Sequence, residues 1–65
     1  MNPVFRIFEP YWDTAQQESS FRAVAEIRAD TMEFHGQYVV FYDTLGVAKA
    51  GWPADSLHHV ERGYE

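Results

Sequence analysis

The chain has 65 residues, no cysteine and a net charge of −5, and 46% of its residues are hydrophobic. This length allows one domain, residues 1–65, that buries only roughly 60% of the surface its unfolded chain exposes, and the lack of cysteine excludes a disulfide-stabilised fold. The hydrophobic and aromatic content excludes a disordered tail. The acidic balance disfavours nucleic-acid binding, because such binding depends on lysine and arginine neutralising phosphates.

The first 20 residues predict a strand followed by a polar segment. Residues 4–8 are mostly apolar, as in a short strand at a sheet edge, and Trp12 is expected to cover one end of the small core. Residues 13–20 are polar, and Asp13 and Gln16 have the spacing of a capping box. A short helical segment after Asp13 and a solvated loop are both compatible with this pattern.

Residues 21–29 alternate between apolar and polar side chains, with the apolar ones at odd positions and only Val24 out of place. This alternation predicts a strand, and we prefer it to a helix because the same apolar residues would surround most of a helix. From Met32 onward the apolar side chains occupy even positions. A strand whose inward-facing positions change in this way must bend, bulge or turn, so we expect a corner or a sharp kink at residues 29–31.

The segment of residues 31–60 predicts an antiparallel meander. Gly36 supplies the positive φ that a tight turn needs, so the apolar residues on either side of it form a hairpin. Asp43 and Gly46 suit the next turn, and Pro53 begins a single helical turn before the last strand. The predicted fold class is mainly β, either a small antiparallel meander or an SH3-like barrel of about five short strands.

Residues 38–42 of this meander are apolar on both faces of the predicted strand. A strand that is covered on both sides lies in the centre of a sheet. In a chain of this size the second cover would be the far wall of a barrel, a helix or another molecule.

His35, His58 and His59 are the candidates for metal binding or acid–base chemistry. Adjacent residues on a strand point to opposite faces, so only one of His58 and His59 could join His35 in a site. We therefore expect no metal site and no cofactor.

Four acidic residues could be assembled into a catalytic carboxylate pair: Asp30, Glu33, Asp43 and Asp55. A pair of this kind needs a sheltered cleft, and 65 residues leave little volume for a pocket of the usual ~300 Å³ or more. We expect the protein not to be an enzyme.

The longest runs without a charged residue, such as residues 34–42, are much shorter than the roughly 20 apolar residues that cross a bilayer. The N-terminal residues lack the basic region and apolar core of a secretory signal. A cytoplasmic protein is the expectation.

Protein binding is the function that these patterns favour. The predicted contact surface combines an aromatic patch with an acidic rim, because tryptophan and tyrosine carry much of the energy of protein interfaces and carboxylates complement a basic partner. The patch consists of Tyr38 and Tyr42 from one face of the central strand together with Trp52. The rim consists of four acids predicted to lie on one surface: Glu26, Asp30, Glu33 and Asp43.

In these general properties the chain resembles small acidic phage-encoded and bacterial inhibitors that offer carboxylates where phosphates would bind. The resemblance implies a regulator or inhibitor that contacts a basic protein surface. Two other functions remain open. One is a self-associating structural subunit in which a second copy covers residues 38–42. The other is an oligonucleotide-binding barrel whose aromatic residues stack on bases, which the net charge disfavours.

Overall fold

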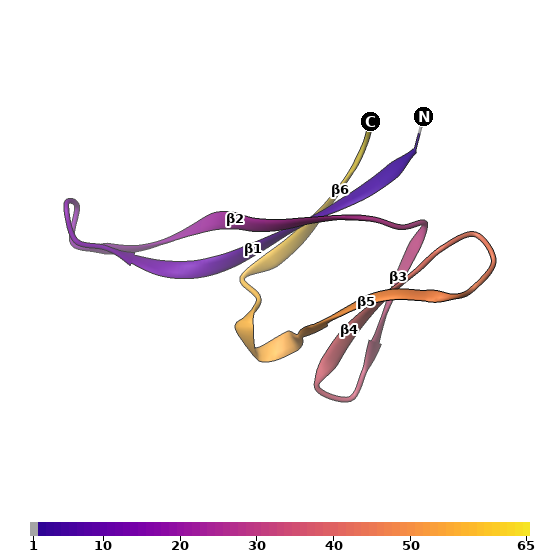
Figure 1. The fold of residues 1–65 in the computed structure, drawn as a ribbon. Coiled ribbons are helices and arrows are strands. Elements are labelled where there is room, and N and C mark those ends of the chain that lie inside the picture. The colour runs from indigo at the N-terminus through magenta and orange to yellow at the C-terminus, as the bar shows by residue number, and fades with distance from the viewer. Residues whose placement is uncertain (1) are drawn as a thin grey trace.

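The computed structural model describes residues 2–65 and contains six strands and one turn of 3₁₀ helix (Figure 1). The strands form two three-stranded antiparallel sheets with the orders β2-β1-β6 and β3-β4-β5. The prediction of a mainly β fold is confirmed. The elements are β1 (Pro3–Asp13), β2 (Glu18–Arg28), β3 (Thr31–His35), β4 (Tyr38–Tyr42), β5 (Ala48–Pro53), η1 (Ala54–Ser56) and β6 (His59–Tyr64).

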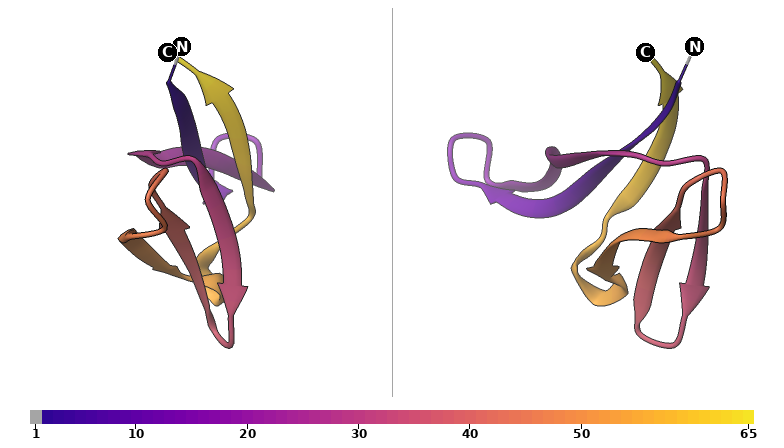
Figure 2. Two further views of the ribbon diagram at one scale, coloured as in Figure 1. Left: turned by 90° about the vertical axis from the view of Figure 1, so that its right-hand side faces the viewer. Right: turned by 45° about the vertical axis from the view of Figure 1, so that its right-hand side comes forward.

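The two sheets do not close into a barrel, which corrects the expectation of an SH3-like barrel of about five strands. Within residues 2–65 no strand pairing connects one sheet to the other. The chain leaves the first sheet at the end of β2, forms the whole second sheet, and returns through η1 to β6 (Figure 2). Each sheet therefore has two edge strands that pair with a neighbour on one side only.

The turn between β1 and β2 is a hairpin turn and not the start of a helix. Asp13 Oδ1 accepts hydrogen bonds from the backbone N–H groups of Ala15 and Gln16, at 3.0 and 3.3 Å. These are the bonds that a helix N-cap makes. Gln17, however, has a φ of 54°, and this left-handed conformation reverses the chain into β2. The helical segment considered after Asp13 is absent for this reason.

Val24 marks a bulge in β2. Ile7 of β1 lies opposite Ala25, whereas the next residue, Phe8, lies opposite Ala23, so Val24 is the extra residue. A bulge of this kind shifts the face on which the following side chains lie. The strand predicted for residues 21–29 is confirmed, and its one misplaced residue is explained.

Beyond the bulge, β1 and β2 continue as a two-stranded extension that we call the arm, residues 9–22. Strand β6 pairs with β1 only from Pro3 to Phe8, so the arm has no third strand, and it projects from the molecule (Figure 1). The radius of gyration is 13.2 Å, against about 11 Å for a compact chain of this length. Trp12 lies in the arm and is 60% exposed, so the prediction that it covers one end of the core is wrong.

The corner expected at residues 29–31 joins the two sheets. Strand β2 ends at Arg28 and β3 begins at Thr31. The Asp30 N–H donates to the carbonyl oxygen of Tyr42 at 2.8 Å, which fixes the corner to the end of β4. The predicted turns follow: Gly36 has a φ of 61°, and a single 3₁₀ turn, η1, begins directly after Pro53.

The core lies between the inner faces of the two sheets. Six hydrophobic residues are buried, and four of them are exposed by less than 2%. Phe5 of the first sheet meets Phe41 of the second with ring centroids 5.4 Å apart. This core is small for a domain, as expected for a chain of this length. The buried residues are Val4, Phe5, Ile7, Ala29, Val39 and Phe41.

Candidate functional site

Strand β4 divides the second sheet into an inner and an outer face. Val39 and Phe41 point into the core and have no solvent exposure. Since side chains alternate along a strand, the remaining residues of β4 point the other way, and their cross-strand partners on β3 share that face. We call this surface the outer face. It consists of Thr31, Glu33, His35, Tyr38, Val40 and Tyr42.

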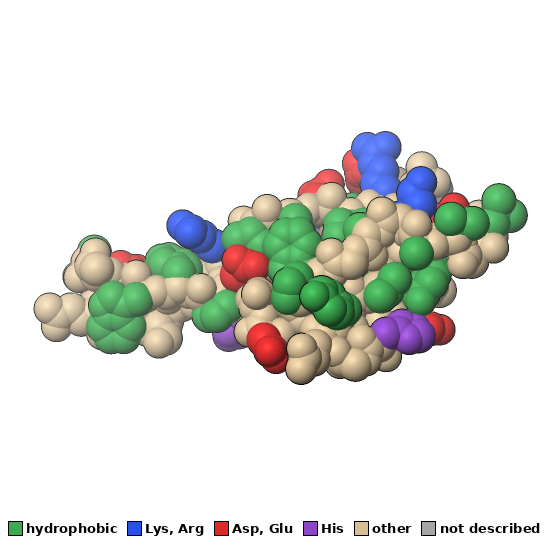
Figure 3. Space-filling model, turned by 60° about the horizontal axis from the view of Figure 1, so that its bottom comes forward, with side chains coloured by type: hydrophobic (Ala, Val, Ile, Leu, Met, Phe, Trp, Pro, Cys, Tyr) green, Lys and Arg blue, Asp and Glu red, His purple; other side chains and the backbone are tan. Residues whose placement is uncertain are grey.

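The outer face combines apolar surface with hydrogen-bonding groups. Tyr38 is 56% exposed, and Val40 and Tyr42 are partly exposed. On β5, Gly51 lies directly opposite Val40. Because glycine has no side chain, the middle of the face is left open. Hydrophobic side chains are exposed both on the arm and over the broad part of the molecule, with single charged side chains between them (Figure 3).

Three polar groups are connected at one side of the outer face. His35 Nε2 lies 2.9 Å from Glu33 Oε2 and 3.0 Å from the Tyr42 hydroxyl. When this nitrogen carries a proton it donates to the carboxylate, and when it does not it accepts from the hydroxyl. The contacts hold the Tyr42 and Glu33 side chains in fixed positions. The arrangement provides both acceptors and donors beside the exposed Tyr38 ring.

Trp52 does not belong to this aromatic patch, although the sequence grouped it with Tyr38 and Tyr42. In the sheet Trp52 lies opposite Val39, so it is on the inner face and packs against the core. Its indole Nε1 donates to Glu9 Oε2 at 3.1 Å, which ties β5 to β1. The antiparallel register decided this position, because it pairs an even-numbered residue of β5 with an odd-numbered residue of β4.

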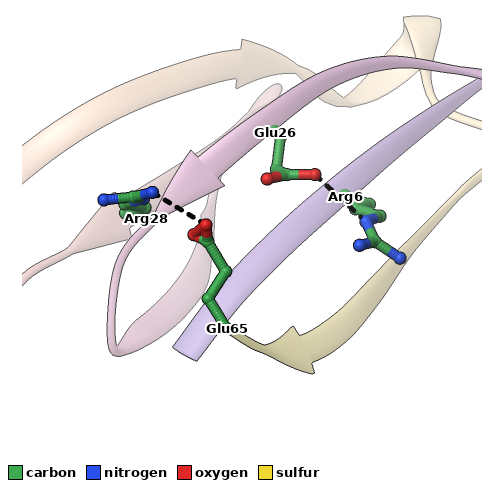
Figure 4. A network of polar contacts seen from close by, with 4 residues as sticks. All are labelled: Arg6, Glu26, Arg28 and Glu65. Carbon is green, nitrogen blue, oxygen red and sulfur yellow. Dashed lines mark hydrogen bonds and ion pairs between the residues drawn. The ribbon is translucent and has the colours of Figure 1, made fainter. Parts of the chain in front are cut away.

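The four acids predicted to form one rim lie in three separate places. Glu26 is on β2 and accepts from Arg6 Nε at 3.1 Å, close to the Arg28–Glu65 ion pair (Figure 4). Glu33 is on the outer face. The other two, Asp30 and Asp43, lie at the corner next to the end of β4, so the expected single acidic surface is not formed.

Asp30 and Asp43 line an open depression of about 320 Å³ together with Arg28 and Lys49. The two cations and two acids nearly balance in charge, so the depression has no strong preference for a ligand of either sign. Asp43 Oδ1 is also engaged, since it accepts from the backbone N–H groups of Leu45 and Val47, both at 2.9 Å. Of the four carboxylates considered for a catalytic pair, Asp30 and Asp43 are the two that line this depression.

Two of the three histidines lie together, although strand alternation predicted that they point to opposite faces. His35 is on the outer face, whereas His58 and His59 lie together against the first sheet, with their Nδ1 atoms 2.7 Å apart. Strand β6 begins at His59, so the strand alternation that would have separated the two rings does not apply to His58. Among the described residues 2–65 there is no group of three or more histidine or acidic side chains suited to a metal ion.

Among residues 2–65, four exposed aromatic residues were not among the predicted site residues, and two of them, Trp12 and Phe21, are 60% and 46% exposed. Both lie on the arm. The available signal was the polar composition of residues 13–20, because strands that flank a polar hairpin tip extend away from the core. In the part of the chain that the structure describes, no helix has the length and hydrophobicity needed to span a bilayer.

Comparison of the chain with protein-family models, with curated proteins and with solved structures gave no match.

Proposed function

We propose that the protein is a small acidic protein-binding module and that its outer face contacts a partner protein. The position of β4 supports this proposal. The strand is central in its sheet and its inner side is fully buried, while its other side presents Tyr38 and Val40 to solvent. Tyrosine combines a large apolar ring with a hydroxyl group, and interfaces concentrate their binding energy in such residues.

The partner that this surface fits has a basic surface. Glu33 lies within the outer face, and Asp30 and Asp43 lie beyond its Tyr42 end. The net charge of −5 adds a general attraction to basic proteins. Glu26 lies apart, paired with Arg6, and is not part of the proposed surface. A module of this size acts by covering part of its partner, so we propose that it is a regulator or an inhibitor.

The test blocks the outer face without disturbing the fold. At Gly51 an added Cβ atom would meet only the Val39 carbonyl oxygen, at 3.9 Å, an ordinary contact. In Gly51→Gln the new side chain therefore covers Val40 from the opposite strand. The partner is isolated from a lysate of the source organism. We expect Gly51→Gln and Tyr38→Ala each to weaken its binding by roughly 30-fold or more, the loss typical of an interface hot spot.

Phe34→Ala is the matched control. Phe34 is an aromatic residue of the same sheet and is 65% exposed, but it lies opposite Val39 and therefore on the inner side. We expect the Phe34→Ala variant to bind the partner with the affinity of the wild type. Calorimetry measures the affinity, and circular dichroism shows that each variant is folded. A partner that loses affinity with Phe34→Ala and keeps it with Gly51→Gln would overturn the proposal.

Self-association is the second candidate function, and the arm is the observation that favours it. An isolated two-stranded hairpin is only marginally stable in water, and the arm also exposes Trp12. A second copy that packed against the arm or the outer face would cover these apolar side chains. The oligomeric state separates this candidate from the binding of a different protein.

A further inference from the structure

His58 and His59 form a contact whose geometry requires one proton. Their Nδ1 atoms are 2.7 Å apart, a distance that two ring nitrogens reach when one donates its proton to the lone pair of the other. His59 Nε2 also lies 3.0 Å from Glu61 Oε2. Because a carboxylate only accepts, Nε2 of His59 carries a proton. His59 Nδ1 is therefore the acceptor in the neutral ring, and His58 Nδ1 is the donor.

The two imidazole rings are held against the base of the arm. His59 stacks on Phe8 of β1 with ring centroids 4.4 Å apart, and His58 stacks on Phe21 of β2 at 4.6 Å. The Phe8 and Phe21 rings meet edge to face at 5.8 Å. The histidine pair thus connects the start of β6 to Phe8 of β1, directly before the arm, and to Phe21 of β2, within the arm.

Adding protons affects this contact in two distinct steps. The first proton binds His58 Nε2, which leaves the bond between the Nδ1 atoms intact and places a cation over the Phe21 ring, a favourable arrangement. A second proton has to bind His59 Nδ1, the acceptor itself. Two N–H groups and two positive charges would then face each other, so the contact has to open.

The charged groups around the pair do not remove this constraint. On β6, Glu61 accepts from His59 Nε2 and does not contact Nδ1, so Nδ1 stays the acceptor in the bond with His58. On β1, Arg6 lies opposite Glu61 and is paired with Glu26 of β2. On the arm, Glu9 follows Phe8 and accepts from Trp52, and Arg22 follows Phe21 and lies over the Tyr11 ring.

We propose that His58 and His59 form a pH-sensitive latch: their rings hold the Phe8 and Phe21 side chains at the base of the arm, beside the backbone bond from the His58 N–H to the Phe8 carbonyl oxygen, and release them when both rings become charged. The inference does not rest on the proposed function. The latch is closed while His59 Nδ1 carries no proton, and it opens in acid when both rings are charged. Opening leaves the arm as a two-stranded hairpin without this support.

Nuclear magnetic resonance of the full chain tests the latch over the range from about pH 8 to 4.5. Nitrogen-15 shifts of the imidazoles report the protonation of each ring, and amide hydrogen exchange, corrected for its intrinsic pH dependence, reports protection. We expect the protection of the arm amides from exchange to fall about tenfold as the second proton binds. This is the effect expected when a hydrogen bond is lost and two like charges repel each other in its place. Protection of Val39 and Phe41 in β4 should stay constant.

Two variants make the result decisive. His58→Phe keeps a ring over Phe21 but carries no proton, so protection in its arm should not change over this pH range. His35→Gln, which removes the histidine of the second sheet, should behave like the wild type. Three results would overturn the latch. The amide protection of the wild-type arm could stay constant while both rings become charged, or the pH response could persist in His58→Phe. The third is a loss of amide protection in β4 at the same pH as in the arm.

Discussion

A single carboxylate oxygen organises the turn between β4 and β5. Asp43 Oδ1 accepts from the N–H groups of Leu45 and Val47, and the backbone of Asp43 bonds Gly46 and Val47. Gly46 has a φ of 77°, which favours glycine. The side chain acts as an N-cap acts for a helix, by satisfying N–H groups that the strands leave unpaired. This structural role limits what Asp43 can contribute to binding.

Removal of that acceptor should destabilise the fold. We expect Asp43→Ala to lower the free energy of unfolding by about 1–2 kcal/mol, because two N–H groups lose a charged acceptor. Asp43→Asn keeps an oxygen acceptor and should recover most of the loss. Urea denaturation measures both variants. Asp55→Ala, which removes the same charge from an exposed residue of η1, is the control. Equal unfolding midpoints for Asp43→Ala and the wild type would contradict this role.

At the scale of the element, β4 shows how one strand carries both stability and the proposed contact surface. Its odd-numbered residues fill the core, and its even-numbered residues lie on the outer face. The strand is apolar on both sides because one side packs into the core and the other belongs to the proposed contact surface. Substitutions on the two faces should therefore have different effects.

Phe41 tests the inner side of the strand. Its ring has no solvent exposure and packs against Phe5. We expect Phe41→Ala to cost about 3–5 kcal/mol, which is a large part of the roughly 5–15 kcal/mol that stabilises a typical domain. Thermal unfolding followed by far-ultraviolet circular dichroism should show a strong loss of folded protein. Tyr38→Ala, on the outer face, should stay within about 0.5 kcal/mol of the wild type. The reverse order would show that the two faces are assigned wrongly.

At the scale of the whole molecule, the shape is long and thin. The principal extents are 44 × 29 × 11 Å, so the core has few layers and most residues lie near the surface. The first and last described residues lie side by side (Figure 2), since Asn2 and Glu65 exchange two backbone hydrogen bonds, of 3.2 and 2.9 Å. These bonds extend the pairing of β1 and β6 and close the end of the first sheet away from the arm.

We expect the chain to be a monomer at micromolar concentration, because two copies with a net charge of −5 each repel one another. Sedimentation equilibrium should give a mass near 7.6 kDa. Trp12→Ser and Gly51→Gln should leave that mass unchanged. A dimer that dissociates with either variant would identify the arm or the outer face as the dimer interface and would favour self-association over the binding of a different protein.

Much of the local structure could be predicted from the sequence because it depends on neighbouring residues. The change in alternation after Ala29 predicted a corner, and the corner is present. Gly36 predicted the β3–β4 turn, and Pro53 predicted the 3₁₀ turn. Each of these features follows from the backbone preference or the facing of a few adjacent residues.

Features that depend on pairing between distant residues could not be predicted in this way. Trp52 faces the core because of the register between β4 and β5, and Trp12 is exposed because β6 is shorter than β1. His58 and His59 come together because β6 begins at His59 and leaves His58 outside the strand, whereas the prediction placed both on a strand. The placement of the acids has the same origin, since Glu26 and Glu33 belong to different sheets.

The sequence by itself determined a single mainly β chain with its turns, its corner and a central strand that is apolar on both sides, because these properties depend on local backbone preferences and on the period of the side chains. Only the tertiary structure decided that the sheets stay open, that an arm projects, and which side of β4 faces solvent. These outcomes depend on how distant strands pair and pack. The free energy of that pairing depends on contacts across the whole molecule and cannot be read from any short segment.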